Sequence, residues 1–164
     1  MITILPTVEI KEPIILKSVV DHLTYISRDK TTEFHAMKND KIKIDYETFY
    51  EMYTMQRKFF QVPWVIVLDP PELFHICPEL EQIRCSYEKA IDCLERIPKI
   101  SYIELGVRLQ RLSDCEKSMI FRDVQIMVDN CVVRNLDTLF LLKKYFNIVL
   151  ENDRCAICPN PDGR

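Results

Sequence analysis

The sequence predicts an all-α fold: an irregular bundle of about six helices with at most one short strand or extended crossover, at 64–68. Only two of the 164 residues are glycine, Gly106 and Gly163. Tight hairpins favour Asn-Gly or Asp-Gly turns, because glycine takes positive φ angles at little cost. The second observation is that apolar residues recur at helical spacing through most of the chain. A chain of this length and composition can bury a core.

The first half of the chain predicts two helices separated by a loop. Pro13 can open the first helix, whose buried face would be formed at i, i+3, i+4, i+7 spacing by Leu16, Val19, Val20, Leu23 and Ile26. Residues 28–44 are polar and rich in lysine, which predicts a loop. Asp45 is a suitable N-cap for a second helix, over 46–60.

The central segment, 61–78, holds four prolines and interrupts the helical pattern. Its apolar run from Trp64 to Leu68 can be a lone strand or an extended crossover. We favour the crossover, because no second clear strand is available to pair with it. Pro71 can begin a short helix through Phe74. We predict one helical domain, 1–150, with a subdivision allowed near 61–78 and a C-terminal tail at 151–164.

The second half carries the clearest helical signals. Pro78 suits the first position of a helix over 78–97, with an apolar seam formed by Leu80, Ile83, Tyr87, Ala90, Leu94 and Ile97. This seam can pair with another chain, but packing inside the molecule is favoured. Ser101 with Glu104 and Ser113 with Glu116 predict capping boxes that open helices 101–112 and 113–132. Asn135 can cap a last helix, to Leu150, which we expect to be the central, mostly buried one.

Charge and cysteine content narrow the class of partner and the compartment. The formal net charge of −3 argues against nucleic acid and anionic membranes as partners. No apolar run is long enough to cross a bilayer, and the N-terminus lacks the basic region of a signal peptide. The odd number of cysteines, 7, argues against a disulfide framework. We therefore expect a protein of the cytosol or the nucleus.

The aromatic helix is the predicted partner-binding surface. It has two apolar stripes, one aromatic and one with Met52, Met55 and Phe59, which is more than one core requires. Buried core is the simplest interpretation of both. A partner surface is the functional one, and stacking of single-stranded nucleic acid on the tyrosines is a more remote one. The predicted partner-binding residues are Tyr46, Phe49, Tyr50, Tyr53 and Trp64.

A metal site is the second prediction, and it depends on Cys155 and Cys158. Two thiolates at this spacing can hold zinc, but a site needs about four ligands. His75 and Cys77 can complete a Cys3His set if the tail folds back; the alternative is a tail with two exposed thiols. Cys77, just before Pro78, is also a candidate nucleophile with His75 as base, although a structural cysteine is favoured because no orienting partner is evident.

These observations favour a non-enzymatic protein–protein interaction domain: an adaptor, a scaffold or a subunit of a larger complex. No Walker loop, dinucleotide fingerprint or nucleophile elbow can be written from the sequence. No cofactor other than zinc is expected, and the oligomeric state is left open. Two alternatives remain. One is a zinc-binding module associated with nucleic acid, and the other is a viral regulator that sequesters a host helix in a groove.

Overall fold

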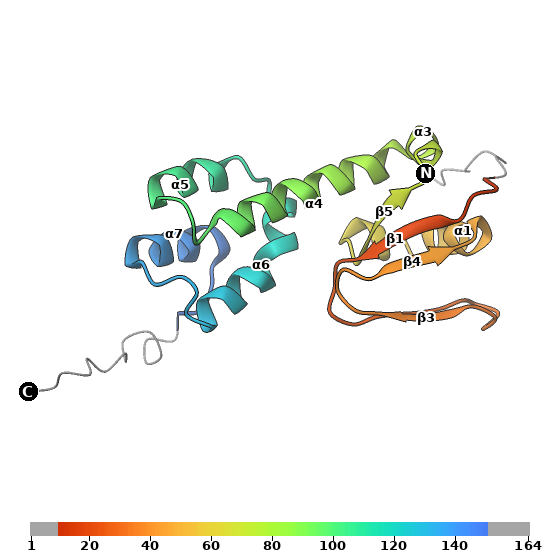
Figure 1. Cartoon of the computed structure of the whole chain (residues 1–164), viewed down its shortest axis with the longest axis horizontal. Coiled ribbons are helices and arrows are strands. Elements are labelled where there is room, and N and C mark those ends of the chain that lie inside the picture. The colour runs from red at the N-terminus through yellow and green to blue at the C-terminus, as the bar shows by residue number, and fades with distance from the viewer. Residues whose placement is uncertain (1–9, 151–164) are drawn as a thin grey trace, which may run out of the picture. The chain divides into compact units, whose positions relative to one another are not determined.

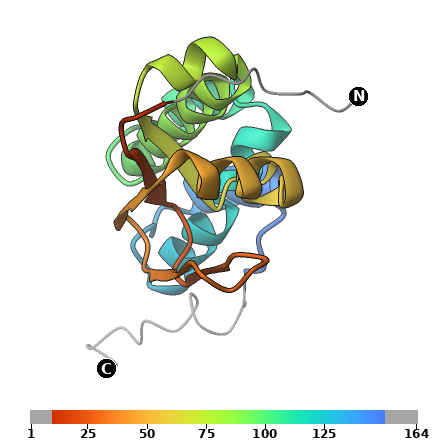
Figure 2. The same cartoon turned by 90° about the vertical axis from the view of Figure 1, so that its right-hand side faces the viewer.

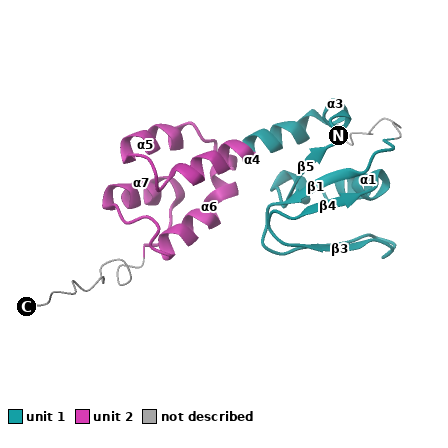
Figure 3. Ribbon diagram, viewed as in Figure 1, with its two compact units in different colours: residues 1–86 teal, residues 87–164 magenta. Residues whose placement is uncertain are grey.

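The computed structural model describes residues 10–150 and divides the chain into two compact units, with the boundary between Ser86 and Tyr87 (Figures 1 and 3). The described residues form seven helices and five strands, and the strands make two antiparallel sheets. The prediction of an all-α bundle is therefore wrong. All five strands lie in unit 1, whereas the described part of unit 2 has helices alone.

Unit 1 begins with a long β-ribbon rather than a helix and a loop, so both of those predictions are wrong. The ribbon is broken into two antiparallel strand pairs: β1 (Ile14–Ser18) with β4 (Lys41–Ile44), and β2 (Leu23–Ile26) with β3 (Glu33–Ala36). Both pairs join the same two segments of the chain in antiparallel order. Ile14 lies opposite Ile44 at one end of the ribbon, and Ile26 lies opposite Glu33 at the other. The ribbon and the helix that follows it face the viewer in Figure 2.

A third strand, β5 (Val65–Asp69), pairs antiparallel with β1 and gives the strand order β4-β1-β5. The apolar run after Trp64 is thus a paired strand, and our preference for an unpaired crossover is wrong. No partner strand is evident in the sequence because the apolar spacing predicts a helix where β1 lies. Val65 and Val67 are buried in the core of unit 1.

The helices of unit 1 are short: α1 (Tyr46–Met55), α2 (Lys58–Gln61) and α3 (Glu72–Ile76). Asp45 caps α1, as predicted, by accepting a hydrogen bond from the Thr48 backbone N–H at 2.7 Å. The helix predicted over 46–60 stops at Met55, because Gln56 leaves the helical conformation. The ring of Tyr25 stacks on that of Phe34, with centroids 5.2 Å apart, and meets the edge of Phe59.

Glu51 of α1 holds the outer part of the ribbon to this core. Its carboxylate accepts hydrogen bonds from the Tyr25 hydroxyl, at 3.2 Å, and from the Arg28 backbone N–H, at 2.6 Å. Burial, followed by the charge of Glu51, raises the pKa of Tyr25 to about 12. The ribbon therefore packs on α1 through a phenol that keeps its proton.

The long helix α4 (Pro78–Arg96) confirms the predicted helix and crosses the boundary between the units. Its apolar seam is used inside the molecule. Leu80 and Ile83 belong to the core of unit 1, and Ala90, Leu94 and Ile97 to that of unit 2. Each unit has its own hydrophobic core.

Unit 2 is completed by three helices: α5 (Tyr102–Gln110), α6 (Asp114–Asp129) and α7 (Leu136–Phe146). All three predicted N-caps are confirmed: the side chains of Ser101, Ser113 and Asn135 each accept a backbone N–H of the first turn. Only the box at Ser113 is shown to be reciprocal, with Glu116 accepting the Ser113 N–H at 2.7 Å.

Candidate interaction surface

The structure distributes the predicted aromatic surface between the core and the exterior of unit 1. Phe49 and Tyr53 are buried, and their rings stack at 5.7 Å. Tyr46 and Trp64 are partly buried, and the Trp64 ring meets the edge of Phe59 at 5.0 Å. Only Tyr50 of this set is exposed, at 40%. These residues therefore do not form one open face, and their role in binding a partner stays a prediction.

The hydroxyl of Tyr46 is buried without a hydrogen-bond partner among the described residues. Burial is the main cause of its raised pKa, and the neighbouring Cys77 and Tyr50 add to it. A buried hydroxyl cannot offer a hydrogen bond to a protein that docks from outside. The exposed apolar side chains that α1 leaves at its surface are Tyr50 and Met55.

The predicted metal ligands are placed only in part. Cys77 is buried at the end of α3, whereas His75 is exposed. Burial raises the pKa of the Cys77 thiol, which argues against the nucleophile considered from sequence. Cys155 and Cys158 lie outside the described residues. Within 10–150, no cluster of three or more His, Cys, Asp or Glu side chains could hold a metal ion, and zinc binding stays a prediction.

Two helices of unit 2, α5 and α7, pack side by side and run in the same general direction. Tyr102, at the start of α5, lines the same depression as Asn135 and Thr138, at the start of α7. One turn further along, a Cβ on Gly106 would lie 3.7 Å from the Leu141 side chain. Both helices direct leucines into the core of the unit.

The outward sides of this helix pair are apolar. Ile103 and Val107 are one turn apart on α5, and Leu136 and Phe140 are one turn apart on α7. Their exposed fractions are 66%, 45%, 67% and 64%, respectively. On helices of about 3.6 residues per turn, Ile103 and Val107 lie on the side opposite the core-facing Leu105. In the same way Phe140 lies opposite the core-facing Leu142. We call these four residues the α5–α7 face.

The sequence did not reveal the α5–α7 face. Helix 135–150 was expected to be the central one because its polar residues cluster on a narrow arc. That expectation is wrong, since Leu136 and Phe140 are exposed within this same polar arc. The signal that could have revealed the α5–α7 face is the mixture of apolar and charged residues on one arc of this helix. A large aromatic side chain flanked by Asp137, Lys143 and Lys144 faces water or a partner, not a core.

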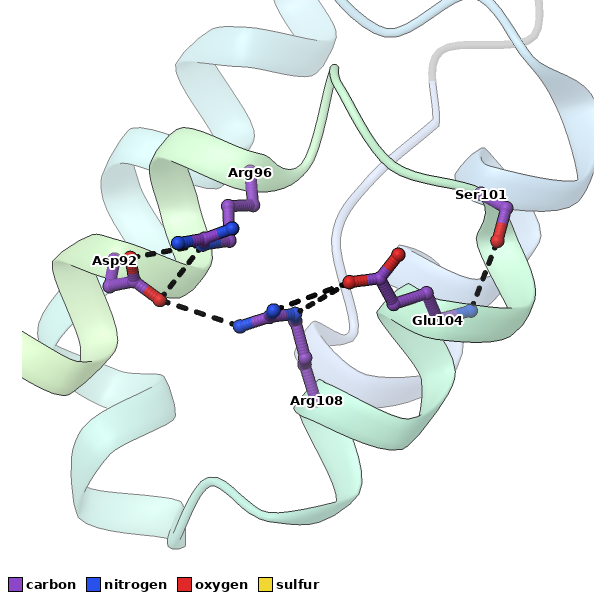
Figure 4. A network of polar contacts seen from close by, with 5 residues as sticks. All are labelled: Asp92, Arg96, Ser101, Glu104 and Arg108. Atoms are coloured by element: carbon purple, nitrogen blue, oxygen red, sulfur yellow. Dashed lines mark hydrogen bonds and ion pairs between the residues drawn. The ribbon is translucent and has the colours of Figure 1, made fainter.

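A charged groove with a volume of about 340 Å³ lies between α4 and α5. Figure 4 shows the polar contacts among residues of these two helices. Arg108 bridges the two helices, with its guanidinium 3.4 Å from Asp92 and 3.2 Å from Glu104. Arg96 pairs with Asp92 at 3.0 Å. The charges of Asp92, Arg96, Glu104 and Arg108 pair with one another, so this network fixes α5 against α4. Burial raises the pKa of Cys93, which lines the groove, so its thiol is protonated at neutral pH.

A second ion pair anchors α6 in the same unit. Lys89 lies 3.0 Å from the carboxylate of Glu116 and donates to the Arg111 carbonyl at 2.9 Å. Burial by itself raises the pKa of Glu116, but hydrogen bonds from Ser113 and Lys89 outweigh it, so the pKa lies below its ordinary value. The polar groups of unit 2 thus hold its helices in place and present the α5–α7 face.

Comparison with protein families, with characterised proteins and with solved structures finds no match to this chain. None of the helices within 10–150 is both long enough and apolar enough to span a bilayer.

Proposed function

We propose that this chain is a non-enzymatic protein–protein interaction domain, acting as an adaptor, a scaffold or a subunit of a larger complex, and that it binds through the α5–α7 face. The observation that carries the proposal is the gathering of Ile103, Val107, Leu136 and Phe140 on the outward side of two adjacent helices. Single exposed apolar residues are ordinary, but contiguous apolar patches on a soluble domain mark interaction sites.

The rigid support of this face also favours recognition. Ser101 and Asn135 cap the two helices at their first turns, and Gly106 of α5 lies against the Leu141 side chain of α7. Helices fixed in this way present side chains with little further loss of conformational freedom on binding. An amphipathic helix laid across two parallel helices is the partner geometry that such a face fits best.

The same proposal places the protein in the cytosol or the nucleus. The five cysteines within the described residues are all free thiols: Cys77, Cys85, Cys93, Cys115 and Cys131. Free thiols on both buried and exposed positions are usual where the medium is reducing.

The test is selection of amphipathic helical peptides from a display library on the immobilised full chain. We expect selected peptides whose binding is weakened about 30-fold or more by Phe140→Glu and by Ile103→Glu, because a charge at the centre of an apolar contact removes a hot spot of about 2 kcal/mol. Met55→Glu is the matched control, since Met55 is equally exposed but lies in unit 1.

Far-UV circular dichroism must show the same helix content in all three variants. If the selected peptides bind the Phe140→Glu chain as tightly as the unchanged one, or if Met55→Glu abolishes binding instead, the α5–α7 face is not the binding surface.

A further inference from the structure

The exposed residues of α7 lie on one arc that is centred on Phe140. They are Leu136, Asp137, Phe140, Lys143 and Lys144. At about 100° per residue, Leu136 and Lys143 lie about 40° and 60° to one side of Phe140, and Lys144 and Asp137 lie about 40° and 60° to the other. Asp137 and Lys144 share the side nearer Leu141, the residue that packs toward α5.

The charges on this arc are not neutralised within the described part of the chain. No ion pair is formed there by Asp137, Lys143 or Lys144, and the one ring contact is that of Lys144 with Tyr145, at 5.6 Å. Phe140 thus lies between Lys143 on one side and Asp137 with Lys144 on the other. A partner that has apolar and charged groups in the matching order complements this arrangement.

We propose that this partner is a second copy of the chain, bound with α7 antiparallel to α7 across a two-fold axis at Phe140. The inference deepens the proposed function and rests on it. This symmetry inverts the height along the helix about Phe140 and keeps the side of the arc. Residues at about the same distance before and after Phe140, and on the same side of the arc, therefore lie beside each other across the interface. Phe140 meets itself, and Asp137 of one copy lies beside Lys144 of the other, twice. Lys143 lays its aliphatic stem along Leu136 of the second copy.

Helix α5 obeys the same two-fold symmetry. Because Gly106 is level with Leu141, the axis at Phe140 passes close to Leu105. Ile103 and Val107 lie two residues before and two residues after Leu105. Each copy would therefore place its Ile103 against Val107 of the other, so the apolar side chains of both helices are covered by an identical face.

Self-complementarity is what distinguishes a second copy from an unrelated partner. A face that binds a different protein needs complementary groups only on that protein, whereas an isologous interface must carry both members of every pair at symmetric positions. The α5–α7 face does so for the aromatic contact, for the apolar contact and for the ion pair. With four large apolar side chains on each copy, the interface is small, and we expect a dissociation constant of about 1–100 μM.

The test measures sedimentation velocity of the full chain over about 1–500 μM, a range that brackets such an affinity. We expect a monomer–dimer equilibrium. Asp137→Lys and Lys144→Asp should each weaken it about tenfold, because each variant places two like-charged pairs at the interface. Phe140→Glu should weaken it about 30-fold or more. Glu88→Lys, an exposed charge reversal on α4, should leave the equilibrium unchanged.

Charge exchange gives the decisive result. An equimolar mixture of the Asp137→Lys and Lys144→Asp chains restores both ion pairs in the heterodimer, so the mixture should associate about as tightly as the unchanged chain. The double variant should regain its homodimer for the same reason. Neither rescue is expected from a general change in charge or from a structural defect.

The outcomes separate this inference from the proposed function. If the unchanged chain is monomeric throughout, or if it dimerises without response to the exchange, the second copy is not the occupant of the α5–α7 face. The proposed function then stands if helical peptides still lose binding to the Phe140→Glu chain. It falls if the peptides ignore that change, whatever the oligomeric state.

Discussion

At the scale of single residues, the most consequential polar group of unit 2 is the carboxylate of Glu116. It is buried, it closes the capping box of α6, and it receives Lys89 of α4. A buried carboxylate is tolerated only where hydrogen bonds compensate for its desolvation. One side chain thus connects the start of α6 with the helix that crosses the unit boundary.

We predict that Glu116→Gln lowers the free energy of unfolding of unit 2 by about 1–2 kcal/mol, through the loss of charged hydrogen bonds at the cap. Chemical denaturation followed by circular dichroism measures this. Asp114→Asn is the matched control: Asp114 is fully exposed in the same first turn and should cost only a few tenths of a kcal/mol.

The same carboxylate gives a pH dependence whose sign follows from its depressed pKa. The unfolded chain binds a proton at Glu116 near the ordinary value of 4.5, whereas the folded chain does so only at lower pH. Its stabilising contribution is therefore fully present above that value and is lost as the pH falls through the folded pKa. The Glu116→Gln chain should lack this part of the acid destabilisation. An identical acid response of both chains would contradict the assignment.

At the scale of elements, the ribbon explains why apolar spacing predicts a helix where residues 14–26 form strands. Ile14 and Leu16 are buried in one strand, and Leu23 and Tyr25 in the next. The period of two is kept within each strand, but the irregular residues between Ser18 and Leu23 shift its phase. Two short strands out of phase imitate the i, i+3, i+4, i+7 pattern of a helix.

The scarcity of glycine did not prevent the ribbon from turning. The ribbon takes its left-handed positions at Lys30, with φ of 62°, and Asn39, with φ of 75°, instead of at glycine. The turn around Lys30 is held by Asp29, whose carboxylate accepts from the Ser27 hydroxyl at 2.6 Å and from the Thr31 N–H at 3.0 Å. Side-chain hydrogen bonds thus replace the conformational freedom that the sequence seemed to lack.

Caps and long helices were predictable because their signals are local. Asp45, Ser101, Ser113 and Asn135 each act within one turn of their own helix, so no distant partner is needed to recognise them. Strand pairing and exposure depend on distant segments. For that reason the pairing of β5 and the outward direction of Phe140 could not be predicted from one sequence.

The left-handed conformation of Lys30 leads to a prediction for the stability of unit 1. Lys30→Gly should stabilise unit 1 by about 1 kcal/mol, because glycine takes positive φ without the clash that a Cβ suffers there. Lys30→Ala, which removes the same charge but keeps the Cβ, should give no such gain. Urea denaturation followed by the fluorescence of Trp64 compares the two variants. Equal stabilisation by both would assign the effect to charge instead of backbone conformation.

At the scale of the whole molecule, the two units have separate cores. The core of unit 1 is formed by residues from the ribbon, α1–α3, β5 and the start of α4. The core of unit 2 is formed by the end of α4, by α5–α7 and by the segments that join or follow these helices. The chain carries one tryptophan, Trp64, which packs on the core of unit 1. Its fluorescence therefore reports on that unit, whereas the helical circular dichroism signal comes largely from unit 2 and α4.

We predict that a core truncation in one unit shifts mainly the signal of that unit. Leu142 is fully buried in unit 2, so Leu142→Ala should remove about 2–5 kcal/mol and lower the denaturant midpoint of the dichroism signal. The Trp64 midpoint should stay close to its original value. Leu73→Ala, an equally buried position in unit 1, should produce the opposite result. If either truncation moves both midpoints together, α4 couples the two cores into one cooperative structure, and the units do not unfold separately.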